Sequence, residues 1–590
     1  MMLEPIRIQR RPVNEAALNL LVKEGVSPFL ARIIAARPIP EHDKKALAVI
    51  QGRLADITSP FLLQDMDKAV ARLRLALKNK EVIGIETDHD CDGQTSHAVL
   101  ITCLKEVFQH PEDKLQSYIG HRMQEGYGLS EALCARILEN PVPPTLLITA
   151  DNGSSDEGRI AKLKAFGIDV IVTDHHAIPS EGIPASAYAV LNPTREDCKF
   201  PDPYIAGCMV AWLLMAATRR TMVDAGDLPK DTPSVLGVLD YVAVGTVADC
   251  VSLARSINNR VIVQYGLQRI NEFKRPCWQA LQPLLKNPQI SAEDLGFLIG
   301  PLLNSDGRLS DALGSVNFLL AESLEAAGPY AQLLWQQNEE RKRIQKELVS
   351  DALKIAENQV MQGRISLVIH LEAGHAGVHG IAASRIKDTF GRPTVILSPK
   401  LNEPEVLTGS CRSVDDVHVR DVLQIISNLH PELLVKFGGH KAAAGLTINL
   451  EDLELFSNAF EEAVGNMLKG KQVGPLLLSD GYVQEQIDLN LVETLKTLAP
   501  FGREFDEPLF EGKAYVRNVR RFGQNLNHLE LKLALHHQES EHTAIWFGGG
   551  DSDKFMLNTG DQVFVVYSLG AQTYQQKTKV SLNLKHVRLV

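Results

Sequence analysis

The chain has few cysteines, and none of them forms a closely spaced pair. Its 590 residues include eight, at positions 91, 103, 134, 198, 208, 250, 277 and 411. Structural zinc sites use cysteines two to four residues apart, and small secreted domains use dense cysteines as a disulfide framework. The spacing argues against both kinds of site. We therefore expect reduced, mostly buried thiols.

A long hydrophobic run is also missing. The most apolar segment, residues 206–218, stops at Arg219-Arg220 and is too short to span a bilayer, so it predicts a buried helix. The N-terminal residues bring three arginines but no apolar stretch of the kind that secretory signals contain. We expect a cytoplasmic protein that makes no use of a membrane.

The chain has no excess of positive charge. Its 61 Lys and Arg residues stand against 72 Asp and Glu, for a net charge of −11. This balance disfavours a protein that coats nucleic acid non-specifically, although it leaves room for a local basic groove. With 45% hydrophobic residues over this length, the chain is too long for one core, and three or four domains are expected.

Strands and helices alternate in the first half of the chain. Apolar, β-branched runs predict strands at residues 82–86, 115–119, 146–150 and 170–173, and helical patterns fall at residues 96–108 and 157–166. Alternation of this kind predicts a parallel sheet with helices on both faces.

The remaining segments predict four further parts. Residues 1–50 read as a helical appendage before a catalytic domain at 51–318, and residues 319–362 read as one long connecting helix. A second α/β domain is expected at 363–475. Short alternating apolar runs in the last part, residues 476–590, suit a small antiparallel barrel.

Acidic and imidazole side chains follow the predicted strands. The strand at 170–173 leads into Asp174, His175 and His176, and the other apolar runs lead into Asp88, Asp90 and Asp92, into Asp151, and, after residues 242–248, into Asp249. Ligands of such sheets bind just past the carboxyl ends of the strands. A single aspartate there is more often a turn or helix cap. Four such ends in one domain make that explanation unlikely.

This set of side chains predicts a metal centre. Extended backbone would point Asp88, Asp90 and Asp92 to one side, where three carboxylates need a cation. A calcium loop of the EF-hand type is excluded, because its twelfth position would be Val99 and not a glutamate. Carboxylate and imidazole donors without thiolates suit manganese or magnesium, and their number suffices for two ions. Such a pair is typical of hydrolases that act on phosphate esters.

The motifs resemble those of a known superfamily. Asp88-His89-Asp90-Cys91-Asp92-Gly93, Ala150-Asp151-Asn152-Gly153, Thr173-Asp174-His175-His176 and Gly245-Thr246-Val247-Ala248-Asp249 resemble the four motifs of the DHH phosphoesterases. Further motifs at residues 121–130, 300–309, 380–385, 409–413 and 438–445 resemble the bacterial 5′→3′ single-strand-specific DNA exonucleases of that superfamily. The likeness runs from about residue 45 to the end of the chain.

The resemblance implies a fold and a role for each residue. The fold would be α/β, with a DHH parallel-sheet domain and a DHH-associated domain joined by the long helix, plus a C-terminal OB-like barrel. The implied ligands of two Mn²⁺ or Mg²⁺ ions are Asp90, Asp92, Asp151, His175 and Asp249, with Asp151 as the bridge. His176 would face the scissile phosphate, and Asp174 would orient a neighbouring imidazole. Asp88 joins them as a third catalytic candidate.

Contacts with DNA are implied as well. The candidates for phosphate binding are Arg122, Arg308, Arg385, Arg412 and the loop Gly438-Gly439-His440, whose glycines leave backbone amides open. Basic and aromatic side chains of the barrel suit base stacking: Arg520, Arg521, Phe522, His528, Trp546, Phe547, Tyr567 and Tyr574. Leu302, where the family usually has arginine, and Asp306, where it has alanine, would remove positive charge beside the phosphate path.

The implied function is metal-dependent degradation of single-stranded DNA to 5′-mononucleotides, in DNA repair and recombination. A single-strand-binding protein and a helicase are candidate partners. Two alternatives remain: a DHH phosphoesterase of short oligonucleotides or dinucleotides, and a non-catalytic replication or repair scaffold. The terminal barrel favours a long substrate over the first alternative. The presence of all five ligands disfavours the second.

Overall fold

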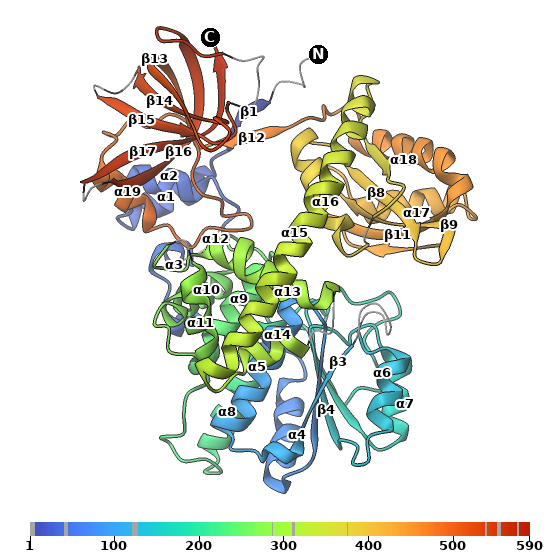
Figure 1. Cartoon of the computed structure of the whole chain (residues 1–590). Coiled ribbons are helices and arrows are strands. Elements are labelled where there is room, and N and C mark those ends of the chain that lie inside the picture. The colour runs from blue at the N-terminus through green and yellow to red at the C-terminus, as the bar shows by residue number, and fades with distance from the viewer. Residues whose placement is uncertain are drawn as a thin grey trace. The chain divides into compact units, whose positions relative to one another are not determined.

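The computed structural model describes residues 6–40, 45–120, 128–285, 287–309, 313–374, 376–536, 538, 540–550, 556–574 and 577–590. Two compact units are present (Figure 1). One comprises Met1–Arg10 and Gln336–Leu478, and the other comprises Arg11–Trp335 and Ser479–Val590. Among the described residues no helix combines the length and the apolar character needed to cross a membrane.

The larger unit contains the predicted parallel sheet. Its five strands run in the order β3-β2-β4-β5-β6, and every neighbouring pair is parallel. The register aligns Thr87, Ala150, Thr173 and Leu191 across β2, β4, β5 and β6. The residues that follow these four therefore emerge at one edge of the sheet. The strands are β2 (Ile83–Thr87), β3 (Leu115–Ile119), β4 (Leu146–Ala150), β5 (Asp169–Thr173) and β6 (Ala189–Leu191).

Helices cover both faces of this sheet, as the alternation predicted. Ile148 and Ile171 point to a core shared with α4 (Met66–Asn79), α5 (Cys91–Thr102) and α8 (Gly207–Asp224). Leu147 and Val172 alternate with them and pack on the other face, against α6 (Glu131–Leu138) and α7 (Glu157–Ala165). The strands are apolar on both sides because both faces are buried.

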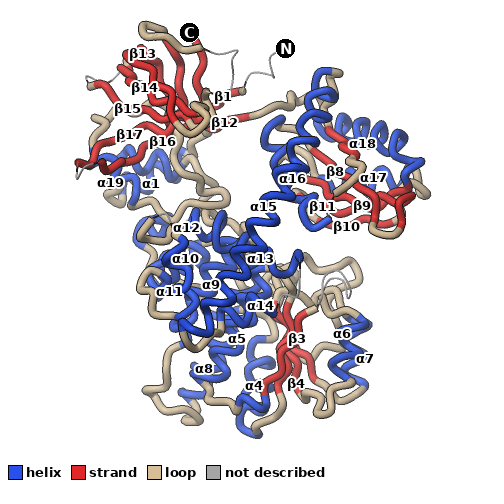
Figure 2. The backbone as a smooth tube through the Cα atoms, viewed as in Figure 1, coloured by secondary structure: helices blue, strands red, loops and turns tan. Residues whose placement is uncertain are grey.

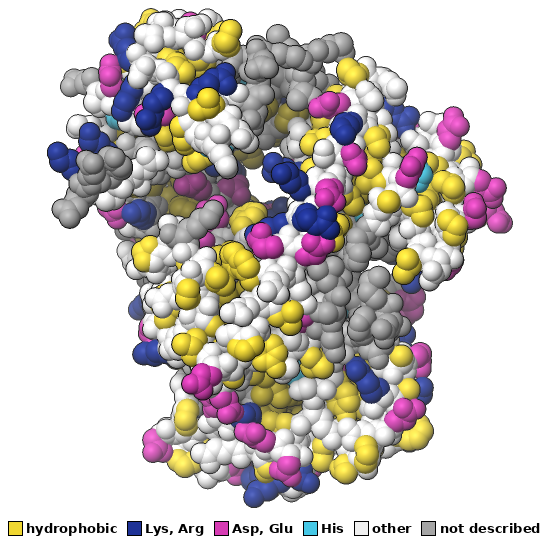
Figure 3. All heavy atoms as spheres, viewed as in Figure 1, with side chains coloured by type: hydrophobic (Ala, Val, Ile, Leu, Met, Phe, Trp, Pro, Cys, Tyr) yellow, Lys and Arg dark blue, Asp and Glu magenta, His cyan; other side chains and the backbone are white. Residues whose placement is uncertain are grey.

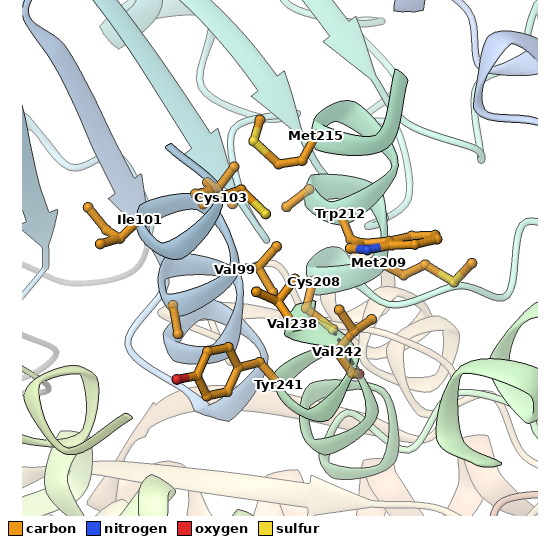
Figure 4. Close-up of a cluster of buried hydrophobic side chains, with 14 of the residues drawn as sticks. Val99, Ile101, Cys103, Cys208, Met209, Trp212, Met215, Val238, Tyr241 and Val242 are labelled. Carbon is orange, nitrogen blue, oxygen red and sulfur yellow. Dashed lines mark hydrogen bonds between the residues drawn. The ribbon is translucent and has the colours of Figure 1, made fainter. Parts of the chain in front are cut away.

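One predicted strand is wrong. The apolar run before Asp249 forms the helix α9 (Leu239–Ala248), which packs against α5 and α8. Figure 4 shows side chains such as Val99, Cys208 and Val242 lying together between these three helices. A fully buried helix is apolar all round, so its sequence gives no period that would distinguish it from a buried strand. The apolar segment at 206–218, in contrast, is the expected buried helix α8.

Other helices surround this core and lead out of it. They are α10 (Ile257–Ile270), α11 (Pro276–Leu281), α12 (Ala292–Asp294), α13 (Gly300–Leu309) and α14 (Leu313–Leu319). The long helix is α15 (Leu324–Met361), which contributes to both units. It begins five residues after the predicted start, because Leu313–Leu319 forms its own helix and the Ser323 hydroxyl accepts a hydrogen bond from the Ala326 amide at the new start.

The smaller unit holds a mixed sheet in the order β10-β11-β9-β8-β7, in which only β7 and β8 pair in parallel. Its strands are β7 (Leu367–His370), β8 (Thr394–Lys400), β9 (Glu403–Arg412), β10 (Lys436–Gly439) and β11 (Ala443–Asn449). The helices α16 (Ala376–Phe390), α17 (Val419–Leu429) and α18 (Leu453–Leu468) pack on it. This is the expected second α/β fold.

The C-terminal strands close into a barrel in the order β13-β14-β15-β17-β16 (labelled β13 to β17 in Figure 2). Only β15 and β17 are parallel, which is the strand arrangement of an OB fold. The strands are β13 (Phe510–Phe522), β14 (His528–Leu535), β15 (Glu541–Trp546), β16 (Gln562–Tyr574) and β17 (Lys577–Leu589). The predicted barrel, and with it the predicted fold class, is confirmed.

The barrel shares one hydrophobic core with helices from elsewhere in the larger unit. That core joins barrel residues to α1 (Glu15–Lys23), α2 (Pro28–Ala35) and α19 (Leu489–Lys496). The buried Arg260 guanidinium of α10 donates to the carbonyls of Val49, Leu498 and Pro500. The segment before the barrel is thereby tied to the helical core. Three further short elements are α3 (Lys45–Gln51) and the paired strands β1 (Arg7–Arg10) and β12 (Leu476–Ser479).

Candidate active site

Acidic side chains converge at the carboxyl edge of the parallel sheet. Asp88, Asp151 and Asp174 directly follow the aligned ends of β2, β4 and β5, and all three are buried. Oxygen atoms of Asp88, Asp90 and Asp151 lie within 4.8 Å of one another. The in-register strand ends explain why Asp88 and Asp151, more than 60 positions apart in the chain, meet in one place.

Asp90 and Asp92 stand at the start of α5. Asp90 Oδ1 caps the helix by accepting hydrogen bonds from the amides of Asp92 and Gly93. The carboxylate of Asp92 accepts from the amides of Gly207 and Cys208, at 2.7 and 3.0 Å, where α8 begins. The positive end of the α8 dipole therefore faces this buried carboxylate.

Two glycines let the carboxylates approach closely. A Cβ atom at Gly207 would lie 2.7 Å from Asp151 Oδ1, and one at Gly245 would lie 2.7 Å from Asp92 Oδ1. Asp151 itself adopts a left-handed backbone with φ of 64°, a conformation that aspartate tolerates better than most residues. The backbone at these three positions therefore lets the acidic side chains pack closely together.

His175 completes the cluster. Its Nε2 atom lies 3.2 Å from Asp151 Oδ1, 3.5 Å from Asp249 Oδ2 and 3.9 Å from Asp92 Oδ2. Asp249 is the C-cap of helix α9, so it reaches the site from a helix and not from a fourth strand end, as the sequence had suggested. The structure therefore brings together all five residues that the sequence suggested as ligands: Asp90, Asp92, Asp151, His175 and Asp249.

The cluster fits a divalent cation. Among the described residues, Asp151 Oδ1 and His175 Nε2 are buried and have no hydrogen-bond partner. Such atoms are costly to bury unless a ligand satisfies them. The possible ligand groups contain carboxylates and imidazoles but no thiol, as Mn²⁺ or Mg²⁺ would require.

The electrostatics point the same way. Burial first, and the neighbouring Asp92 and Asp90 carboxylates next, raise the pKa values of Asp151 and Asp249 well above the ordinary range. Burial also lowers the pKa of His175, which favours its neutral, metal-binding form. A cation at the centre would remove the repulsion that these shifts reflect.

His176 is held by Asp174. Its Nδ1 atom lies 2.8 Å from Asp174 Oδ1, and the His176 backbone amide donates to the same oxygen at 3.1 Å. Burial would lower the pKa of His176, but the hydrogen bond and charge of Asp174 raise it to about 9. Burial would likewise raise the pKa of Asp174, yet His176 holds it below the ordinary value. Asp174 therefore fixes the orientation of the second imidazole and favours its protonated form.

Asp88 is held in place by its neighbour. Its Oδ1 atom accepts from the His89 amide at 2.8 Å and lies 2.8 Å from His89 Nδ1. Sequence reasoning gave His89 no role. The only hint of its contact with Asp88 in the sequence is that the two residues are adjacent. Adjacent Asp and His residues are too common for this to predict a contact.

Leu302 and Asp306, which depart from the family pattern, are both buried and contribute to the packing of the fold. Leu302 is fully buried in the main core. Asp306 is also buried, and its Oδ2 atom accepts from the Ser315 amide at 2.7 Å, in the first turn of α14. Neither side chain adds to the exposed charge, so the expected loss of positive charge is limited to the missing arginine itself.

The candidate phosphate contacts lie mostly in the smaller unit. Arg385 is exposed on α16, and Arg412 at the end of β9 donates to Ser410 Oγ and to the Cys411 carbonyl. Gly438 and Gly439 end β10, and the His440 amide closes the hairpin to β11 by donating to the Ala443 carbonyl. Arg122 lies outside the described residues, as does the side chain of Arg308 on α13.

An aromatic cluster marks one end of the barrel. The rings of Phe522, His528 and Phe547 lie 5.3 to 6.3 Å from one another, and Phe547 is 65% exposed. Lys and Arg side chains gather over the barrel on the face that Figure 3 shows. Tyr567, in contrast, is a core residue, and the side chain of Tyr574 is outside the described part.

Three parts of the chain match known domain families. Residues 82–246 match the DHH family, N-terminal domain, residues 365–466 match the DHHA1 domain, and residues 481–586 match the RecJ OB domain. These matches fall on the parallel sheet with its helices, on the mixed sheet and on the barrel.

Whole-chain comparisons agree. The single-stranded-DNA-specific exonuclease RecJ of Haemophilus influenzae is 35% identical over 516 residues, which cover 86% of this chain and 87% of that protein. The protein of the same name from Dickeya dadantii is 32% identical over 602 residues, or 98% and 99% of the two chains. The crystal structure of RecJ in complex with Mn²⁺ from Thermus thermophilus has a TM-score of 0.78 at 23% identity and covers 99% of this chain and 79% of that one. This last likeness concerns the fold.

Proposed function

Because this chain belongs to the RecJ family of single-stranded-DNA-specific exonucleases, we propose that it hydrolyses single-stranded DNA from the 5′ end and releases 5′-mononucleotides. The observation that best supports this is the buried cluster of Asp92, Asp151, Asp249 and His175, with two central atoms left without a hydrogen-bond partner. We propose Mn²⁺ or Mg²⁺, as two ions, for this cluster.

In this proposal Asp90, Asp92, Asp151, His175 and Asp249 would hold the two ions, and Asp151 would serve both. When bound, the ions supply a polarised water as the nucleophile and neutralise charge on the scissile phosphate. The protein's own contribution is to hold the ligands in fixed positions. The α8 amides fix Asp92, and the backbone at Asp151 turns its carboxylate into the cluster.

His176 serves the substrate. Asp174 holds its Nδ1 atom, and we propose that Nε2 donates a hydrogen bond to a phosphoryl oxygen of the bound strand. A proton held there, as the raised pKa of about 9 favours, stabilises negative charge that develops on the phosphate. Asp174 acts by keeping this imidazole protonated and oriented. Asp88, at the end of β2, lies beside Asp90 and Asp151 and would support the metal cluster from that side.

The DNA strand requires contacts outside the metal cluster. We propose that Arg385, Arg412 and the loop Gly438-Gly439-His440 contact phosphates, and that the rings of Phe522 and Phe547 stack on bases. Arg122 and Arg308 stay candidates for phosphate contact from the sequence. A strand long enough to reach the barrel is a better substrate in this scheme than a dinucleotide.

The cellular setting follows from the substrate. Single-stranded DNA in cells is covered by single-strand-binding protein and is produced from duplexes by helicases, so we propose both as partners in DNA repair and recombination. We also propose that the protein acts in the cytoplasm. A nuclease of this kind must reach chromosomal DNA, and in bacteria that DNA lies in the cytoplasm.

Digestion of end-labelled single strands tests the proposal. Strands labelled at the 5′ end should lose the label as mononucleotide at once, whereas strands labelled at the 3′ end should shorten progressively. Both reactions should need Mn²⁺ or Mg²⁺ and should stop with a chelator. Release of the 3′ label first, or equal rates with and without the chelator, would refute the polarity or the metal dependence.

A further inference from the structure

Asn192 occupies a position at the active-site edge of the sheet that the proposed reaction does not yet explain. It follows β6 directly, in register with the strand ends that carry Asp151 and Asp174, and its side chain is fully buried. It has no charge and is not among the possible metal ligands of the described residues.

All four hydrogen-bonding positions of this amide are used. Nδ2 donates to the His176 carbonyl at 2.8 Å and to Ser154 Oγ at 2.9 Å. Oδ1 accepts from the amide and the hydroxyl of Thr194, both at 2.8 Å. An amide is the side chain that can donate twice and accept twice at such short range. Other residue types of this size would leave a buried partner unsatisfied.

These bonds join the loops that follow three adjacent strands. Ser154 lies after β4, and its amide donates to Asp174 Oδ2 at 3.0 Å. Asp174 and His176 lie after β5, and Asp174 Oδ1 holds the His176 ring. His176 is therefore held at its ring by Asp174 and at its carbonyl by Asn192, while Asn192 also supports Asp174 through Ser154.

The Thr194 hydroxyl can replace Asn192 only in part as a donor to the His176 carbonyl. Thr194 Oγ1 lies 3.0 Å from the His176 carbonyl and 2.8 Å from Asn192 Oδ1, and its single proton can serve one of them at a time. When the Thr194 hydroxyl donates to Asn192 Oδ1, the donor to the His176 carbonyl is Asn192 Nδ2.

We propose that Asn192 is a positioning residue that fixes the His176 imidazole for its contact with the scissile phosphate. This inference rests on the proposed function, because it assumes that His176 touches the substrate. Without Asn192 the His176 carbonyl loses its amide donor, and the ring samples positions that do not face the phosphate. A misplacement of about 1 Å in such a group lowers turnover by up to about 100-fold.

The test combines Asn192→Ala with His176→Ala in a double-mutant cycle, measured as kcat and KM on single-stranded DNA at saturating Mn²⁺. Asn192→Ala alone should lower kcat at least tenfold and change KM less than threefold. In the His176→Ala background the same substitution should change kcat less than twofold, because Asn192 acts through His176. The half-saturating Mn²⁺ concentration should stay within about twofold of wild type.

Asn271→Ala is the matched control. This asparagine also donates two hydrogen bonds, to the carbonyls of Leu267 and Ile290, and accepts one from the Ile290 amide. Its loss should lower the melting temperature without a selective loss of kcat.

Two results would overturn different statements. An equal loss from Asn192→Ala in the wild-type and His176→Ala backgrounds would mean that Asn192 merely stabilises the fold. A wild-type protein without nuclease activity, or a fully active His176→Ala variant, would instead contradict the proposed function.

Discussion

Glu86 is a residue whose protonation the fold controls. It lies in β2 with its carboxyl group buried, and burial first, then the Asp156 charge, raises its pKa well above the ordinary value of 4.5. Among the described residues, Glu86 Oε2 and Asn152 Oδ1 both lack a hydrogen-bond partner, although Asn152 Nδ2 donates to Glu86 Oε1 at 3.1 Å.

The sign of the pH effect follows from this shift. The folded state binds the Glu86 proton more tightly than the unfolded chain does, so its contribution to stability is full below pH 4.5 and is lost as the pH rises toward the folded pKa. Glu86→Gln cannot ionise and adds a donor for Asn152 Oδ1. Its free energy of unfolding in urea, without metal, should exceed that of wild type at about pH 8 and by less at about pH 5.

Glu139→Gln, at an exposed position, serves as the control for a glutamate-to-glutamine change outside the buried site. A Glu86→Gln variant that is less stable than wild type at the higher pH, or a difference that shrinks as the pH rises, would show that Glu86 is ionised in the fold.

At the same scale, the sequence predicted which side chains meet but not how they are held. Asp90, Asp92, Asp151 and His175 could be found because each follows a recognisable strand. Asn192 could not, because β6 has three residues and Ala189-Val190-Leu191 is too short a run to stand out as a strand. The His89 contact with Asp88 depends on a side-chain rotamer, which no sequence pattern encodes.

At the scale of elements, the close approach of α9 to α5 and α8 sets the geometry of the site. A Cβ atom at Gly245 would lie 2.3 Å from Thr95 Oγ1, 2.6 Å from Cys208 Sγ and 2.7 Å from Asp92 Oδ1. Gly245→Ala must therefore push α9 outward and move Asp249 with it. Overpacking of this kind costs about 1–3 kcal/mol of stability.

We expect Gly245→Ala to lose at least 100-fold in turnover and to need more Mn²⁺ for half-saturation, while remaining folded. Gly158→Ala is the control, because nothing lies within 4 Å of a Cβ at that position in α7. Thermal denaturation and Mn²⁺ titration of the nuclease activity measure the two effects. Wild-type activity in Gly245→Ala would mean that Asp249 is not held by this packing.

The elements also show where sequence patterns fail. The strands β2, β4 and β5 were predicted within a residue or two because short β-branched runs alternate with helices. The helix α9 was taken for a strand because an element that is buried on every side has no polar face to reveal its period. The start of α15 was misplaced because α14 and α15 are separated by only four residues.

At the scale of the whole molecule, the barrel belongs to the same compact unit as the metal cluster and shares a core with α1, α2 and α19. Removing it would expose that core, and the segment just before it is itself tied to Arg260 through the carbonyls of Leu498 and Pro500. Its role in DNA binding is therefore better tested by surface substitutions than by truncation.

The double variant Phe522→Ala, Phe547→Ala should raise KM on long single strands about tenfold and leave cleavage of very short oligonucleotides unchanged. Stacking on such rings is worth about 1–3 kcal/mol per base, and kcat should not change because no metal ligand is touched. Phe166→Ala, an exposed phenylalanine at the end of α7, should have no effect. An unchanged KM in the double variant would assign these rings to a protein partner instead.

The domain boundaries expected from the sequence stay predictions. The composition separates the barrel from the sheets, but the chain enters the larger unit twice, at residues 10–11 and 478–479, and leaves it in between, at 335–336. Contacts between segments so distant in sequence depend on three-dimensional packing, and no local sequence pattern predicts them.

The central claim is that the carboxylate and imidazole cluster is the metal centre of a nuclease, and Asp151→Asn tests it most directly. The amide keeps the size of the side chain but weakens its hold on both proposed ions. Loss of a buried, repelled carboxyl should leave the metal-free protein at least as stable as wild type. We predict that the release of 5′-mononucleotides from single-stranded DNA at saturating Mn²⁺ falls at least 100-fold in this variant, with an unchanged or higher melting temperature. Near wild-type turnover by a folded Asp151→Asn protein would contradict the account.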